Sequence, residues 1–331
     1  MKFVKMAAFA AVTGLVAIGA ARAEGIDDPD RAAYYETFKG KTIAFVPAAM
    51  GIDLTEGWAK IMKSQADKLG MNFTIRDAAW SADTGAQAIT GLIGEKPDVI
   101  VVHNPDVQSY ARLLRKAEQA GIKVVQVNMK SSYATDAYVG ADWVGIGEAS
   151  AQAVVDSCGA GTSGKVQIVQ GALTAAASAY TMKGVDNILS QHPEINVVSN
   201  QAADWDATKA RNITATVLQQ HPDLCASIGF WDVMDTGTAA AIKEASKQDV
   251  VLVTSGGGAT MACDNIKEGL FDVVISYDVP KQGADLNTMI RSLIASDRPA
   301  GETKVVLYSP LTTITKDTIT GRSCWDLDSL N

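Results

Sequence analysis

The sequence predicts an α/β protein built from two doubly wound, Rossmann-like parallel-sheet domains, with a ligand cleft between them. Three observations predict this class. Short β-branched runs alternate with longer amphipathic segments, which is the pattern of a parallel sheet with right-handed crossovers. The same order of elements recurs in both halves of the chain. The 331 residues also exceed what a single hydrophobic core usually holds.

The first 23 residues are predicted to be a secretory signal peptide. Two lysines give a positive start, an apolar run follows over 6–20, and Ala21 and Ala23 supply the small residues of a cleavage site. The apolar run is too short to span a membrane, and no later segment reaches spanning length. We therefore expect an exported mature chain that begins near Glu24.

In the first half, the strand at 42–47 leads into a helix whose apolar stripe runs from Trp58 to Leu69 and which Gly70 ends. We assign Trp58 to the core side of this helix. A second helix is expected to begin after Asp106 and to end at Gly121. The remaining strands of this half are predicted at 72–76, 99–103 and 123–127.

The second half repeats this scheme, with strands predicted at 166–169, 195–199, 226–230, 250–254 and 273–277. A weak internal repeat supports the likeness of the two halves. Sixteen residues separate Trp80 from Pro97, and sixteen separate Trp205 from Pro222, with a strand after each proline. Two domains of similar topology follow from this order.

Charge and motifs restrict the function. The formal net charge is −8, and loss of the predicted signal peptide, which holds three cations and no acid, lowers it to −11. An acidic chain with no lysine and arginine cluster argues against a nucleic-acid partner. The sequence has no GxSxG elbow, no GxxxxGK[ST] loop and no HExxH motif. We therefore expect no enzyme activity, no metal and no cofactor.

Four cysteines in an exported chain can form two disulfides, and three pairings are possible. Cys158 follows a predicted helix and Cys225 begins a predicted strand, so both are expected at the end of the second domain away from the cleft. This placement favours a bond between Cys158 and Cys225. Cys263 would then pair with Cys324.

The residues at the predicted strand ends are aromatic and polar. Trp80, Trp205 and Trp231 lie there together with Asn104 and Asn128. Ligands of doubly wound sheets bind at the carboxyl ends of strands. Flat aromatic faces beside hydrogen-bonding groups suit a molecule with hydroxyls around apolar C–H faces. These positions predict a site for a small polar molecule, and Asp53, after the first strand, is near enough to join it.

The chain resembles the periplasmic sugar-binding proteins of the ribose and galactose type, whose ligand core LacI-class repressors share. The resemblance covers about 41–316. It rests on the first strand, on the run from Pro97 to Asp106 and on the segments 123–128, 140–142, 170–171, 183–184 and 203–206, with Gly283 after Tyr277.

The resemblance implies a first lobe of 24–141 plus 278–308 and a second lobe of 142–277 plus 309–331. Three crossovers, near Ala141, Tyr277 and Pro310, would form the hinge. Ligand would bind between the lobes and closure would bury it.

The resemblance also assigns roles to single residues. Asn104 matches a family asparagine that bonds hydroxyls, Trp205 an aromatic residue that stacks on the sugar, and Lys183 a common arginine. Asn128 and Gly256 stand where ribose binders carry aspartates, Trp231 replaces an asparagine and Tyr277 a glutamine. A pentose-sized sugar or polyol other than ribose is therefore implied. The candidate ligand-binding residues are Asp53, Trp80, Asn104, Asn128, Lys183, Trp205, Trp231, Gly256 and Tyr277.

The resulting hypothesis is a monomeric periplasmic binding protein that delivers a sugar or polyol to an ABC permease and that is also suited to contact a chemoreceptor. Two other classes remain open. The first is a receptor for a signalling molecule such as autoinducer-2, which the strand end at 45–47 and the segment 206–209 also resemble. The second is an exported enzyme on the same scaffold.

Overall fold

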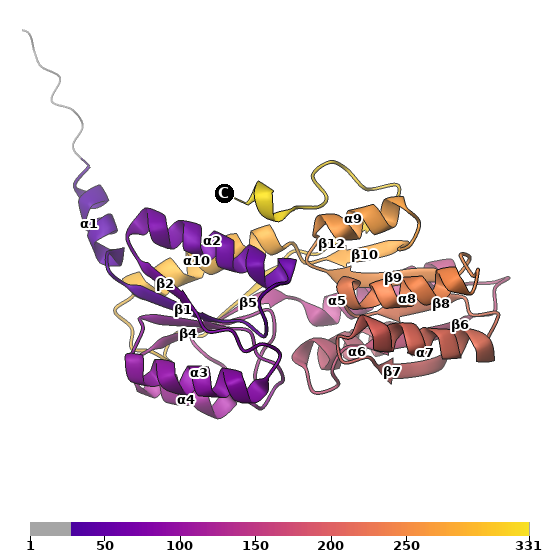
Figure 1. Ribbon diagram of the computed structural model, residues 1–331, viewed down its shortest axis with the longest axis horizontal. Helices are drawn as coiled ribbons and strands as arrows, with labels where there is room; N and C mark the ends of the chain where they lie inside the picture. The colour runs from indigo at the N-terminus through magenta and orange to yellow at the C-terminus, as the bar shows by residue number, and fades with distance from the viewer. Residues whose placement is uncertain (1–27, 331) are drawn as a thin grey trace, which may run out of the picture.

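The computed structural model describes residues 28–330, which form two six-stranded sheets, each flanked by helices on both faces. The strand order is β11-β5-β4-β3-β1-β2 in one sheet and β12-β10-β9-β8-β6-β7 in the other. We call these sheets with their helices the first lobe and the second lobe (Figure 1). The predicted signal peptide and the predicted mature start lie outside the described residues.

The first lobe contains strands β1 (Thr42–Val46), β2 (Asn72–Ile75), β3 (Val99–Val102), β4 (Lys123–Val127), β5 (Ala137–Ala141) and β11 (Val305–Ser309), with helices α1 (Pro29–Phe38), α2 (Asp53–Leu69), α3 (Ala82–Glu95), α4 (Ala111–Gln119) and α10 (Val279–Ala295). All neighbouring strands of this sheet run parallel. Helices α2 and α10 pack together on one face, and α3 and α4 pack together on the other.

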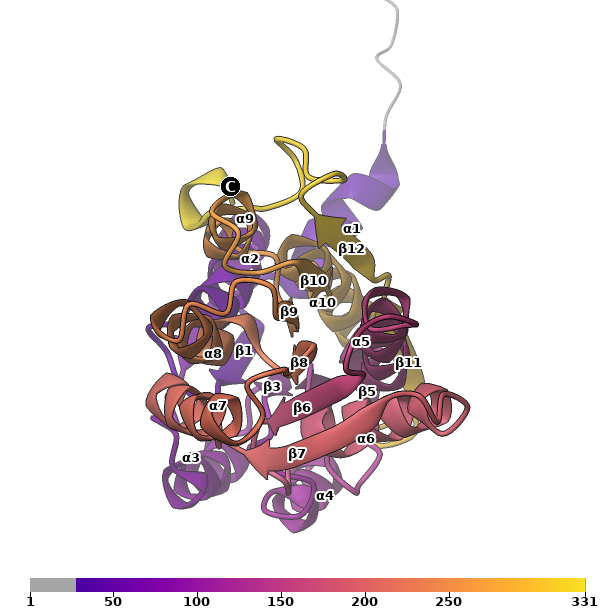
Figure 2. The same ribbon diagram turned by 90° about the vertical axis from the view of Figure 1, so that its right-hand side faces the viewer.

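The second lobe contains strands β6 (Lys165–Gln170), β7 (Asn196–Ala202), β8 (Ala226–Gly229), β9 (Val251–Gly256), β10 (Val273–Ser276) and β12 (Thr312–Thr315), with helices α5 (Trp143–Ser157), α6 (Ala176–Leu189), α7 (Ala207–Gln220), α8 (Asp232–Glu244) and α9 (Thr260–Lys267). Only β12 runs antiparallel to its neighbour among the described strands. Figure 2 shows α7 and α8 on one side of this sheet and α5 and α6 on the other.

The chain passes between the lobes three times, after β5, after β10 and between β11 and β12. Each β-α unit of a parallel sheet places the strand's carboxyl end and the next helix's start on one edge. The two lobes turn these edges toward each other. The predicted two-domain doubly wound class is therefore confirmed.

Local sequence explains where most elements end. Helix α2 buries Trp58 and Met62 in the core and stops at Gly70, which is left-handed with φ 66° and bonds back to Ala66. The helix predicted to follow Asp106 begins later, so that prediction was wrong. Asp106 caps a separate turn by accepting from two nearby backbone N–H groups, and α4 starts only at Ala111.

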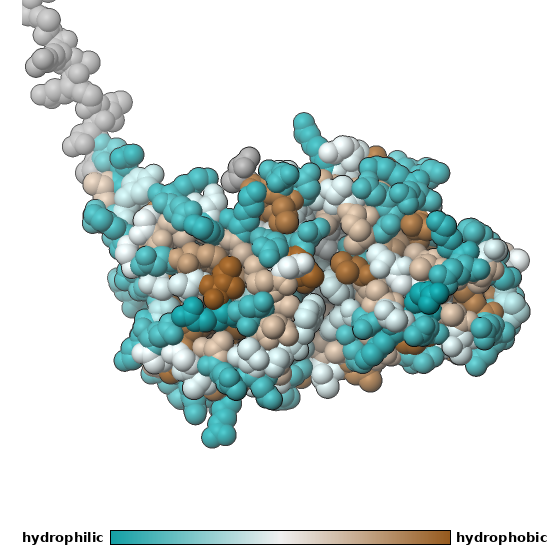
Figure 3. Space-filling view, viewed as in Figure 1, coloured by the Kyte–Doolittle hydropathy of each residue, from teal (hydrophilic) through white to brown (hydrophobic). Residues whose placement is uncertain are grey.

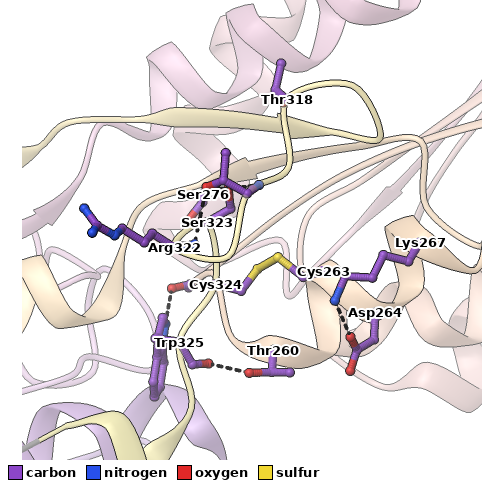
Figure 4. The surroundings of a disulfide bond; sticks show 12 residues. Thr260, Cys263, Asp264, Lys267, Ser276, Thr318, Arg322, Ser323, Cys324 and Trp325 are labelled. Carbon is purple, nitrogen blue, oxygen red and sulfur yellow. Dashed lines mark hydrogen bonds and ion pairs between the residues drawn. A yellow bond between two sulfur atoms is a disulfide. The ribbon is translucent and has the colours of Figure 1, made fainter.

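Both predicted disulfides are present, Cys158–Cys225 and Cys263–Cys324. The second bond ties the C-terminal tail to α9 of the second lobe (Figure 4). Trp325 continues this attachment, because its indole N–H donates to the Gly257 carbonyl at 2.7 Å.

The same tail also touches the first lobe. The Trp325 ring lies so close to α2 that a Cβ on Gly57 would be 2.8 Å from it. Lys60 of α2 donates to the carbonyl of Leu327, which begins the short helix η1 (Leu327–Ser329). The tail therefore forms a further link between the lobes.

No helix within residues 28–330 combines the length and the apolar character that a membrane crossing requires. The face of the molecule drawn in Figure 3 is coloured mostly from hydrophilic to intermediate, with small separate hydrophobic patches. The large apolar side chains are mainly buried on both faces of each sheet, as the continuous apolar strands predict.

Candidate ligand-binding site

A cavity of about 540 Å³ lies between the facing strand ends of the two lobes. Loops of the first lobe and loops of the second lobe contribute to its walls in comparable measure. The lining residues are Ala48, Ala78, Trp80, Ser81, Asn104, Pro105, Asp106, Tyr110, Met129, Ala172, Thr174, Asp204, Trp205, Asp206, Trp231 and Val233. We call this cavity the cleft.

A second, much smaller cavity of about 30 Å³ adjoins the cleft, and four residues line both. We call it the deep chamber. Its walls are mainly aromatic and apolar. They consist of Ile52, Leu54, Trp80, His103, Asn128, Met129, Trp143, Trp205, Phe230, Trp231 and Tyr277.

Two tryptophans enter the cleft from equivalent turns of the two lobes. Trp80 follows β2 and Trp205 follows β7, and each is the second of two consecutive left-handed residues, with φ 62° and 66°. Such non-glycine backbone is strained and persists where surrounding structure enforces it, commonly at ligand sites. In both turns the next residue, Ser81 or Asp206, caps the following helix. The repeat read from the sequence is thus a structural repeat.

Trp231 stands between these two tryptophans. Its ring centroid lies 6.3 Å from that of Trp80 and 6.3 Å from that of Trp205, with interplanar angles of 55° and 81°. Trp205 in turn lies against Gly171, where a Cβ would come within 2.0 Å of the indole. The three rings form the aromatic part of the cleft, and Trp80 remains 56% exposed at its mouth.

The amide of Asn104 is held in one orientation. Its Nδ2 donates to Gln126 Oε1 at 2.9 Å and to the Met129 carbonyl at 2.8 Å. Both amide hydrogens are therefore used inside the protein. The buried Oδ1 has no protein partner and belongs to a residue that lines the cleft. Asn104 thus presents a hydrogen-bond acceptor to a ligand.

The side-chain amide of Asn128 is held through its oxygen rather than through its N–H groups. Its Oδ1 accepts from Gln282 Nε2 at 3.3 Å, and Gln282 Oε1 accepts from the Trp58 indole at 3.1 Å. Asn128 and Tyr277 both line the deep chamber. Burial raises the pKa of Tyr277, so the hydroxyl stays protonated.

His103 lines the deep chamber from the end of β3. The residue is 3% exposed, and neither ring nitrogen has a hydrogen-bond partner among residues 28–330. Its ring meets that of Trp58 edge to face, with centroids 5.3 Å apart. Burial lowers the pKa of His103 to about 4, so the imidazole is neutral near pH 7.

A buried carboxyl group lies over Gly256. A Cβ on this glycine would be 1.9 Å from Asp232 Oδ2, so the carboxyl group of Asp232 occupies the space that a side chain at 256 would need. Burial raises the pKa of Asp232 to about 7, and the charge of Asp53 in the facing lobe adds to the rise. Neither Gly256 nor Asp53 lines the cleft or the deep chamber.

Lys183 lies outside both cavities. It is an exposed residue of α6 and lines a separate surface cavity near the crossing between β5 and α5, together with Lys130 and Tyr308. The cleft and the deep chamber bring together the other predicted residues, namely Trp80, Asn104, Asn128, Trp205, Trp231 and Tyr277.

Sequence reasoning left His103, Met129 and Trp143 out of the candidate residues, although all three line the deep chamber. His103 had a usable signal, because it directly precedes Asn104 at a strand end. Trp143 had none, since its place depends on the crossing from β5 to α5. There its indole donates to the Asn128 carbonyl at 2.7 Å.

The charged residues that line the cleft are all acidic. Among the residues that line the cleft and the deep chamber there is no lysine or arginine, whereas Asp106, Asp204 and Asp206 stand at the outer rim. The polar groups aimed inward are an amide acceptor, a neutral imidazole and a phenol. This set suits a neutral molecule with several hydroxyls beside apolar faces.

The lobes also touch across the front of the cleft. The Val107 N–H of the first lobe donates to the Thr174 carbonyl of the second lobe at 3.2 Å. Because Thr174 lines the cleft and Val107 follows the lining residue Asp106, this bond joins the two lobes beside the cleft.

The chain is similar to known proteins over much of its length. A family model described as "Periplasmic binding protein domain" matches residues 43–298. The ribose import binding protein of Bacillus subtilis is 28% identical over 204 residues, which cover 61% of this chain and 66% of that protein. The chain thus spans about two thirds of that relative.

Two further curated relatives differ in their named ligands. The xylitol-binding protein of Mycolicibacterium smegmatis is 27% identical over 268 residues, covering 80% of this chain and 70% of that protein. The D-allose-binding periplasmic protein of Escherichia coli is 30% identical over 149 residues, covering 45% and 48%.

Solved structures share the fold. A solute-binding protein of Burkholderia graminis in complex with D-arabinose superposes with a TM-score of 0.77 at 21% identity, covering 86% of this chain and 98% of that chain. A galactofuranose binding protein gives a TM-score of 0.75 at 18% identity, covering 84% and 95%. These identities support the architecture alone.

Proposed function

Because the chain belongs to the family of periplasmic binding protein domains, as its match over residues 43–298 shows, we propose that it captures a sugar or polyol of about pentose size. The ligand is held between the two lobes and delivered to an ABC permease. The periplasm is the compartment that the family implies.

One observation carries the proposal. Trp80 and Asn104 of the first lobe line the same cavity as Trp205 and Trp231 of the second lobe. A ligand in this cavity touches both lobes at once, so it binds the closed arrangement better than an open one. That difference in affinity is what shifts the population toward closure.

The chemistry of the cleft supports a neutral polyhydroxylated ligand. Indole faces pack on the apolar C–H faces of a sugar or an extended polyol, and the Asn104 acceptor meets a hydroxyl donor. The relatives named for ribose, D-allose and xylitol bind molecules of this class. The absence of cations from the described lining favours uncharged sugars and polyols over sugar acids and sugar phosphates.

We assign the moving lobes to 24–141 plus 278–308 and to 142–277 plus 309–331. The three crossings between them serve as the hinge. The closed lobes together present the surface that a permease, or a chemoreceptor, recognises. In this role the protein acts as a monomer and carries out no chemical step on its ligand.

A thermal-shift panel tests the proposal. The panel contains pentoses, hexoses, pentitols and autoinducer-2, with a sugar phosphate and a sugar acid as charged controls. We expect a rise in Tm that grows with ligand concentration for one or more neutral sugars or polyols, and none for the charged controls. A response to autoinducer-2 alone would favour a signal receptor, and turnover of a hit would favour an enzyme.

The variant Trp205→Ala tests the cleft itself. We expect it to abolish the ligand-induced rise in Tm while far-ultraviolet circular dichroism remains unchanged, because Trp205 is only partly buried. Tyr35→Ala is the matched control, since it removes an aromatic ring that is 41% exposed on α1, away from the cleft. Normal ligand response in Trp205→Ala would remove the indole from the site.

A further inference from the structure

The deep chamber contains the largest unmet hydrogen-bonding capacity of the described site. Both nitrogens of His103 are buried without a protein partner. A buried polar group without a partner is unfavourable, so its retention in the core calls for an explanation. The sheet does not explain why a histidine is retained here. The bond that His103 contributes to the sheet comes from its backbone N–H, which donates to the Val46 carbonyl at 3.0 Å, and does not involve the imidazole.

The position of the ring is fixed by packing. Trp58, which is fully buried, meets the imidazole edge to face. The indole N–H of Trp58 is taken by Gln282, so it cannot serve the histidine. This contact places the imidazole at the wall of the deep chamber, and both of its nitrogens are left unmatched among the described residues.

The size of the chamber defines what can enter. Its volume of about 30 Å³ accommodates a group the size of one water molecule. Asn128 and Tyr277 share its walls with His103, so donors and acceptors surround a small space with otherwise apolar sides. A terminal hydroxyl group of a larger ligand matches both this size and this polarity. A charged ammonium or carboxylate end would lack a counter-charge on the described walls.

We propose that His103 is a ligand-binding residue that sets specificity, because its neutral imidazole bonds the terminal hydroxyl of a ligand whose remainder lies in the cleft. A neutral imidazole offers one donor and one acceptor, and a hydroxyl can satisfy both kinds of partner. The inference rests on the proposed function and deepens it. It selects ligands that carry an unblocked terminal hydroxyl at the end that points into the chamber.

The test uses calorimetric titration of xylitol and D-arabinitol, each paired with the analogue that lacks both terminal hydroxyls, because a single remaining one could still enter the chamber. For a compound that binds wild type, we expect His103→Leu to lower the affinity 10- to 100-fold. In wild type, the analogue should lose a similar factor. In the variant, parent and analogue should bind alike, because the partner of the hydroxyl is gone.

Stability separates a ligand role from a structural one. Leucine removes an unmatched polar group from an apolar site, so the Tm of unliganded His103→Leu should equal or exceed that of wild type. His103→Gln keeps a hydrogen-bonding group and should recover part of the affinity. His221→Leu, which removes a histidine at the end of α7 outside both cavities, should change nothing.

The possible failures are distinguishable. If wild type binds none of the neutral compounds of the panel, the proposed function is wrong and the inference falls with it. If wild type binds but His103→Leu binds equally well, a water molecule alone satisfies the imidazole and the inference is wrong while the function stands. A clear loss of Tm in unliganded His103→Leu would likewise identify a structural residue and overturn the inference.

Discussion

Asn104 illustrates how a single amide acquires a fixed direction. Its two N–H groups donate to Gln126 and Met129, so only its oxygen is left without a partner among the described residues. An acceptor that is fixed in this way selects ligands that can donate a hydrogen bond to it. The residue therefore contributes to recognition through a network that extends behind it, where Gln126 is itself held by Thr135.

Asn104→Ala should weaken binding by about 1–3 kcal/mol, because a ligand hydroxyl loses its acceptor in a buried site. The variant should also be less stable, since Gln126 and Met129 lose their donor. Calorimetric titration and urea unfolding measure the two effects separately. An affinity equal to that of wild type would exclude Asn104 from ligand contact.

Asp235 predicts a pH effect on stability. Burial raises its pKa to about 7, whereas hydrogen bonds from Thr254 and Thr238 oppose the rise. The unfolded chain releases this proton near the ordinary pKa of about 4. Between pH 4 and 7 the folded state thus binds more protons, and the contribution of this group to stability falls as the pH rises.

Asp235→Asn cannot ionise, so its stability relative to wild type should increase from pH 5 to 7, by at most about 1.4 kcal/mol per pH unit. Urea unfolding at several pH values measures this difference. The exposed variant Asp326→Asn, in the tail, serves as control. A difference that is constant with pH would show that Asp235 is already ionised in the folded protein.

For single residues, the sequence was informative where the position of a residue depends on the strand that precedes it. Trp80, Asn104 and Trp205 lie in the loops that follow strands, and they meet in the cleft. Lys183 lies inside a helix, where a rotation of the helix decides which way it faces, and it is exposed. The position of Asp232 over Gly256 depends on contact between the start of α8 and the end of β9, which spacing along the chain does not reveal.

At the scale of elements, the turn before α7 packs on the loop between β6 and α6, because Trp205 rests on Gly171. Gly171→Ala should displace the indole and weaken ligand binding at least tenfold, since the added Cβ would lie 2.0 Å from the ring. Titration of a compound found in the panel measures the loss. Unchanged affinity would show that the ring can shift without consequence.

Gly91→Ala is the matched control for this substitution. A Cβ on Gly91, within α3, would meet nothing within 4 Å. Alanine favours a helix over glycine by about 1 kcal/mol, so this variant should be slightly more stable and should bind normally.

Most strands were predictable from their continuous apolar runs, whereas β5, β11 and β12 were not predicted as strands. Val305, Val306 and Tyr308 of β11 are all more than a third exposed because this strand lies at the edge of its sheet, although its sequence is a continuous apolar run like that of a buried strand. β12 joins the second sheet only because the chain crosses the hinge a third time. Its pairing depends on tertiary structure rather than on its own sequence.

At the scale of the whole molecule, the tail links the lobes through Trp325 and the Cys263–Cys324 bond. Replacing both cysteines by serine should cost about 2–4 kcal/mol of stability, because a long loop is freed in the unfolded chain. It should also accelerate ligand release, since the tail that bridges α2 and α9 loses its anchor. Stopped-flow fluorescence measures the release rate.

The other disulfide is a matched control. Cys158–Cys225 spans 67 residues and Cys263–Cys324 spans 61, so the chain-entropy effects are nearly equal. Removal of Cys158–Cys225 should reduce stability to a similar degree without changing the release rate, because this bond does not anchor the C-terminal tail. Equal release rates in both variants would contradict a role of the tail in holding the lobes together.

The central claim, that one ligand contacts tryptophans of both lobes, is tested most directly by the indole N–H signals of the six tryptophans in a ¹⁵N–¹H spectrum. The indoles of Trp58, Trp143 and Trp325 donate to protein acceptors. On titration with a bound pentose or pentitol, the signals of Trp80, Trp205 and Trp231 should move together, and those of Trp58 and Trp325 should move least. Movement confined to the tryptophans of one lobe, or none in these three, would contradict the account.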